Sequence, residues 1–180
     1  MNHARAAAHR GAGATSKLSN GIDALATILA YWSGASFFVL SLYITYDALA
    51  RHFHLPYSGI TDEVSSYVLA VGGSWGLAYG LKVGAHVRID LLIGLAGPAL
   101  RRALDIAAGA LTLVFAALLA WYAWGQAAES FDLDTRSITV LRAPLAIPQV
   151  MVAIGYGLLA IQAASMLVRG VAPGVGGDRI

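Results

Sequence analysis

Four long apolar segments alternate with shorter polar segments along the chain. An α-helix needs about 20 apolar residues to cross the hydrocarbon core of a bilayer, so each segment is a candidate membrane span. The predicted spans are residues 22–46, 64–81, 106–126 and 148–168. The pattern therefore predicts an all-α integral membrane protein, with four transmembrane helices in one domain over residues 22–168.

The two ends of the chain lie outside this membrane domain. Residues 1–21 are rich in Gly, Ala and Ser, carry three basic residues and contain no acid. This composition predicts a disordered basic tail. The tail also resembles a transit peptide, but a long apolar segment follows it directly, as in a signal anchor. We therefore expect the first span to be retained, and we expect residues 169–180 to form a second tail.

The segment between the second and third spans, residues 82–105, alternates apolar and charged positions. Leu91, Leu92 and Leu95 share one face of a helix, because successive residues are about 100° apart around its axis. A strand would also place every second residue on one side, but a strand edge at a membrane has nothing to pair with. We expect a short interfacial amphipathic helix that begins near Arg88.

Glycine recurs every four residues in the second span, at Gly72, Gly76 and Gly80. These positions lie on nearly one helix face, and such a strip of small residues lets another helix approach closely. Glycine is also common in membrane helices without any such role. We expect this strip to pack against another subunit.

Basic residues are distributed unevenly between the two sides of the predicted membrane domain. Nine Lys and Arg residues lie in the two tails and the middle loop, and three lie in the other two loops. Because basic residues are retained on the cytoplasmic side, both termini are expected in the cytoplasm. The two outer loops then carry six acids, which include Asp132 and Asp134.

Composition and charge placement exclude several classes of function. With 58% apolar and 12% charged residues, the chain is too hydrophobic to be an ordinary soluble domain. Its basic residues lie beside the predicted spans and not along one solvated face, so a nucleic-acid partner is not expected. It has no cysteine, and its histidines lie outside the spans; His52 and His54 alone make a poor metal site. No span has a charge at its centre, which disfavours a stand-alone ion-coupled carrier, and the spans offer no polar cluster at one depth for a membrane enzyme. We predict no catalytic, cofactor or metal residue.

The segment from the end of the second span to Leu92, read with the residues before it, resembles the small Q-type membrane subunit of tripartite ATP-independent periplasmic (TRAP) transporters. The matching residues, in chain order, are Arg51, Phe53, Glu63, Gly76, Lys82, Gly84, His86 and the run Val87 to Leu92 with Arg88 and Asp90. Ser137, Pro144 and Pro148 resemble the loop entering the family's last span. Two departures are Lys82 in place of arginine and Leu145 in place of an aromatic residue, and lysine cannot reproduce a bidentate arginine contact.

The resemblance implies an accessory scaffold subunit in the bacterial inner membrane. In this family a large M-type subunit carries the solute and the coupling ion, and a periplasmic binding protein delivers the solute. The Q-type subunit would support the large subunit and contact membrane lipids, and we expect the acidic outer loops, with Asp132 and Asp134, to help dock the binding protein. The interface candidates are Arg51, Glu63, Gly72, Gly76, Gly80, Lys82, Gly84, His86, Arg88, Asp90, Asp132 and Asp134. His86 could titrate or contact a partner, or could fix its own segment by bonding a backbone carbonyl or Asp90. The alternative function is a stand-alone small carrier or channel.

Overall fold

The computed structural model describes residues 2–84 and 97–169, and these residues form four helices. They are α1 (Asn2–His52), α2 (Thr61–Lys82), α4 (Pro98–Asp132) and α5 (Ala146–Arg169). Within the described residues, β-pairing is limited to one isolated bridge, between Arg136 and Pro144. The predicted all-α class is confirmed.

Three of these helices are long and apolar enough to cross a membrane, over Asn20–His52, Arg102–Asp132 and Ala146–Val168. They contain the first, third and fourth predicted spans and extend beyond them. Helix α2 contains the second predicted span, but it is not one of the three membrane-length apolar helices found in the described ranges. Its four glycines, four serine or threonine residues and two acids make it less apolar, so its passage through the membrane stays a prediction.

One predicted segment differs from the structure, and another lies mostly outside the described residues. Helix α1 begins at Asn2 and so includes most of the expected tail, whose alanines favour helix. Most of the predicted interfacial helix falls at residues 85–96, outside the described residues. Its remainder belongs to α4, which begins at Pro98 after the extended residue Gly97. Proline suits the first position of a helix, because its missing N–H would have no partner there.

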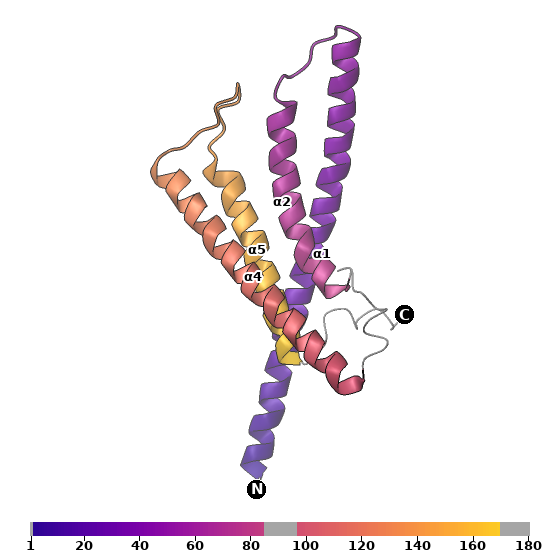
Figure 1. Ribbon diagram of the computed structural model, residues 1–180, viewed down its shortest axis with the longest axis vertical. Helices are drawn as coiled ribbons and strands as arrows, with labels where there is room; N and C mark the ends of the chain where they lie inside the picture. Colours follow the sequence, from indigo (N-terminus) through magenta and orange to yellow (C-terminus); the bar gives the residue numbers. More distant parts are fainter. Residues whose placement is uncertain (1, 85–96, 170–180) are drawn as a thin grey trace.

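The helices form two antiparallel hairpins, α1–α2 and α4–α5, which meet along α2 and α5 (Figure 1). The hairpins approach each other at one end and diverge toward the other, and the first part of α1 projects beyond the bundle (Figure 1). We name these ends after α2: the Lys82 end, where α2 finishes, and the Glu63 end, where it starts. The buried core lies toward the Lys82 end and includes Ala26, Leu81, Leu158 and Met166.

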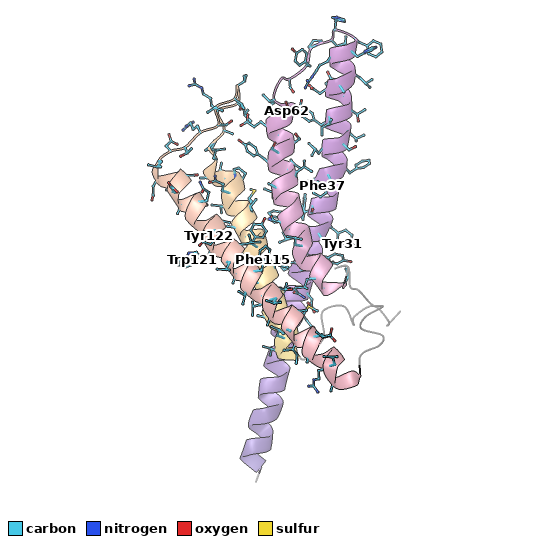
Figure 2. The ribbon with its side chains drawn as sticks, viewed as in Figure 1. Tyr31, Phe37, Asp62, Phe115, Trp121 and Tyr122 are labelled. Carbon is cyan, nitrogen blue, oxygen red and sulfur yellow. The ribbon has the colours of Figure 1, made fainter. Side chains whose placement is uncertain are left out.

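Many large apolar side chains are exposed rather than buried. On α4, Phe115, Trp121 and Tyr122 lie along the helix (Figure 2), and their exposed fractions are 63%, 77% and 72%. In water such a surface would be unfavourable, whereas lipid or another membrane subunit can cover it. The exposed apolar faces therefore agree with the membrane class of the three long helices.

Candidate subunit interface

Helices α1 and α2 approach each other closely at Gly72. The Ser33 hydroxyl donates a hydrogen bond to the Gly72 carbonyl oxygen over 2.6 Å. A Cβ atom added at Gly72 would lie 2.8 Å from the Phe37 ring, which is closer than real Cβ contacts. At Gly76 the added atom would be 3.8 Å from Ser33 Oγ, and at Gly80 it would meet nothing within 4 Å. Thus Gly72, the first glycine of the strip, packs against α1 of the same chain, whereas Gly80 has free space beside it.

Helices α2 and α5 approach each other closely at Gly155, which sequence reasoning did not single out. A Cβ added there would lie 2.5 Å from the Ser74 hydroxyl oxygen and 2.9 Å from the Ser74 backbone carbon. Nearby, the Trp75 indole N–H donates to the Met151 carbonyl oxygen over 2.9 Å. A glycine inside the last apolar segment was the available signal, but its partner position could not be known from spacing.

At the Lys82 end, polar side chains join three helices. The Lys82 ammonium group donates to the Thr27 hydroxyl over 2.8 Å and to the Asp23 carbonyl oxygen over 3.1 Å, which links α2 to α1. The Gln162 amide, on α5, donates to the Asp23 carboxylate over 2.9 Å. Gln162 is only 1% exposed. Lys82, predicted as an interface residue, therefore bonds inside the chain in this structure.

At the Glu63 end, Arg51 is paired within its own helix. Its Nε donates to the Asp47 carboxylate over 2.8 Å, and its guanidinium lies 5.5 Å from the centre of the Tyr57 ring. Asp47 is 1% exposed and also accepts a hydrogen bond from the Ser58 backbone N–H over 3.3 Å. Because a buried carboxylate requires such partners, this cluster fixes the α1–α2 loop (residues 53–60) against α1. The Asp47–Arg51 spacing of four residues was visible in the sequence.

Glu63 connects the start of α2 to the α4–α5 loop (residues 133–145). The side chain is buried and accepts hydrogen bonds from the Tyr67 hydroxyl, over 2.7 Å, and from the Thr139 hydroxyl. Glu63 precedes the predicted second span. The hydrogen bond from Thr139 lowers the pKa of Glu63, and it outweighs the opposite effect of burial. Glu63 thus joins the two hairpins, a role that needed the position of Thr139 to be recognised.

The α4–α5 loop carries the two predicted acidic docking residues. Asp132 ends α4 and Asp134 follows it with a positive φ of 45°, and both side chains are exposed. Asp134 forms an exposed ion pair with Arg136, at 3.3 Å. Backbone hydrogen bonds from Ser137 to Ala143 and from Leu145 to Thr135 close the base of the loop. The loop therefore presents acidic side chains at the Glu63 end of the molecule.

Two adjoining hollows lie on the face formed by α1, α2 and the start of α5. One, of about 370 Å³, lies between α2 and α5 and is lined by residues that include Tyr67, Trp75, Pro144 and Met151. The other, of about 390 Å³, lies between α1 and α2. Three residues line both hollows, namely Trp32, Ser36 and Val68. We call this surface the Trp32 face.

The remaining predicted interface residues are only partly described. Gly84 follows α2 with a positive φ of 70°, and its N–H donates to the Leu81 carbonyl oxygen over 3.2 Å. Glycine suits this left-handed conformation at a helix end. His86, Arg88 and Asp90 lie outside the described residues. Across residues 2–84 and 97–169, no group of three or more acidic or histidine side chains could hold a metal ion.

Comparison with known proteins identifies the family. Residues 40–172, well over half of the chain, match the model of the DctQ component of tripartite ATP-independent periplasmic transporters. No curated protein matches the chain. The match includes most of the structural features described above, from Asp47 and Arg51 at the end of α1 to Gly155 and Gln162 on α5. The chain therefore belongs to the DctQ family, the small components of tripartite ATP-independent periplasmic transporters.

Proposed function

We propose that this protein is the accessory scaffold subunit of an ion-coupled TRAP uptake transporter. Membership of the DctQ family makes it a transporter component. The observation that supports a scaffold role is that three motif residues, Arg51, Glu63 and Lys82, each bond to other parts of the same chain. Groups committed to internal contacts fix the shape of a subunit, and they are poorly placed to bind and release a solute or ion.

In this proposal the large membrane subunit performs transport and this chain supports it in the inner membrane. The test is reconstitution into liposomes of this chain alone, of the large subunit with the binding protein, and of all three. We expect solute uptake only with all three components. Uptake by this chain alone would instead establish the stand-alone carrier or channel.

The proposed orientation places both termini and the Lys82 end in the cytoplasm, with the α4–α5 loop outside. Because the chain has no native cysteine, single cysteines can be introduced without background labelling. Leu133→Cys should react with a membrane-impermeant maleimide from outside, and Asp90→Cys should react only after the membrane is opened. Outside labelling of Asp90→Cys would contradict the orientation.

A further inference from the structure

The Trp32 face is a concave surface that the chain does not fill. Its two hollows share Trp32, Ser36 and Val68, so they form one continuous surface over α1, α2 and the start of α5. Helix α4 packs on α5 and supplies none of the residues that line either hollow. Small residues, including Ala35, Ser36 and Gly72, form part of the surface and permit close approach of another helix.

The indole N–H of Trp32 lies at a depth of the predicted span where lipid offers no hydrogen-bond acceptor. It lies ten residues after Ile22, the first residue of the predicted span, which is roughly 15 Å along a helix and about half of a 30 Å hydrocarbon core. The side chain is 67% exposed, and its indole N–H has no acceptor within the described part of the chain. By contrast, the Trp75 N–H is bonded to the Met151 carbonyl. Indole groups exposed to lipid normally lie at the membrane interface, near polar headgroups.

We propose that the Trp32 face binds a transmembrane helix of the large transporter subunit, which presents a carbonyl or hydroxyl oxygen to the Trp32 N–H. A lipid acyl chain could fill the hollows, but it has no acceptor at this depth, and an unmatched N–H in hydrocarbon is unfavourable. Glu63 is a positioning residue for this surface, because through Thr139 it holds the loop that supplies Leu141 and Pro144 to one wall. The inference rests on the proposed function, since it names the surface that meets the partner.

Crosslinking within the assembled complex tests the surface directly. Ser36→Cys and Val68→Cys place a single thiol in both hollows, and Val114→Cys, on exposed α4, is the matched control. Each variant is co-expressed with the large subunit, labelled with benzophenone maleimide, irradiated and analysed by mass spectrometry. We expect crosslinks to the large subunit from positions 36 and 68, several-fold more than from position 114.

The outcomes separate this inference from the proposed function. If the complex forms but positions 36 and 68 crosslink only to lipid or to a second copy of this chain, the inference is overturned and the scaffold role stands. If the unaltered chain does not co-purify with the large subunit, the proposed function fails, and the inference fails with it.

A second variant tests the hydrogen bond. Trp32→Phe keeps an aromatic ring and removes the N–H, so we expect the affinity for the large subunit in nanodiscs to fall about fivefold. Trp121→Phe, on the exposed surface of α4, is the control and should bind as the unaltered chain does. Equal affinity of Trp32→Phe and the control would overturn the assignment of an acceptor to the partner helix.

Discussion

The Lys82 end and the Glu63 end of the bundle are held together in different ways. At the Lys82 end the helices converge on a buried core, and Lys82, Asp23 and Gln162 join three of them through side-chain hydrogen bonds. At the Glu63 end the hairpins diverge, and the contact between them runs from Glu63 to a loop. One end is therefore fixed by helix packing, whereas the other leaves the Trp32 face open and depends on a few polar contacts at its edge.

The two ends of this small subunit differ in how tightly the helices pack and in how much surface they leave uncovered. A closely packed end fixes the positions of the helices, and an open end leaves surface for other subunits. Arg51 and Glu63 lie at the Glu63 end and Lys82 at the Lys82 end, and each makes contacts within the chain. Substitutions at the two ends should consequently separate effects on the folding of the isolated chain from effects on assembly.

The largest effect on folding is expected where the two hairpins meet. Gly155→Ala would place a methyl group against Ser74, and this overpacking should destabilise the fold by about 1 to 3 kcal/mol. Gly157→Ala is the matched control, because an added Cβ there meets nothing within 4 Å and alanine favours helix. The stability of both variants can be measured by unfolding with SDS in mixed micelles. A similar stability for the two variants would contradict the close α2–α5 contact.

A smaller loss of folding stability is expected when the polar network at the Lys82 end is disrupted. Lys82→Met removes the hydrogen bonds to Thr27 and to the Asp23 carbonyl, and interhelical hydrogen bonds in membranes contribute about 1 kcal/mol. Lys82→Arg retains a donor and should be close to the unaltered chain in the same unfolding measurement. If Lys82→Met unfolds at the same SDS fraction as Lys82→Arg, this network does not stabilise the bundle.

At the Glu63 end we expect a local effect and little change in overall stability. Glu63→Ala removes the acceptor for Thr139, so amide hydrogen exchange in the α4–α5 loop should accelerate. Glu63→Gln keeps one acceptor oxygen and should have a weaker effect. Unchanged exchange in Glu63→Ala would show that this contact does not hold the loop.

The same contact should depend on pH. Because the pKa of Glu63 is lowered in the folded state, ionised Glu63 stabilises the loop fully above its ordinary pKa of 4.5. That contribution is lost as the pH falls below this value and through the lowered pKa. Loop exchange, corrected for its intrinsic pH dependence, should therefore rise in acid in the unaltered chain and stay flat in Glu63→Ala.

The smallest effect on folding is expected at the exposed acids of the α4–α5 loop. Asp134 and Arg136 form an exposed ion pair, which contributes under about 1 kcal/mol. Charge reversal at Asp132 and Asp134 should leave unfolding nearly unchanged, and it should slow uptake when the binding protein is limiting, because surface charges steer association. This slowing should diminish as salt is raised. Uptake equal to that of the unaltered chain would remove the docking role.

Sequence patterns predicted most of the helices well, because the position and length of a helix depend mainly on residues that are neighbours in the chain. Apolar length located the three membrane-length helices, whereas α4 begins at Pro98, inside the segment 82–105 that was expected to lie between the second and third spans. The ordered motif from Arg51 to Asp90 indicated the family, which the match over residues 40–172 confirms. The extent of the first helix was underestimated, because composition alone did not predict helix before residue 22.

Only the tertiary structure decided which of these residues face each other. The four-residue glycine repeat is equally compatible with a partner subunit or with α1, and the position of Ser33 and Phe37 places Gly72 against α1. Likewise, Glu63 meets Thr139 and Gln162 meets Asp23 across 76 and 139 residues of chain. Helix periodicity fixes which side chains share a face, but the rotation of each helix about its axis is set by packing with its neighbours. That rotation directs Glu63 and Lys82 toward distant parts of the chain and leaves Trp32 on the open face.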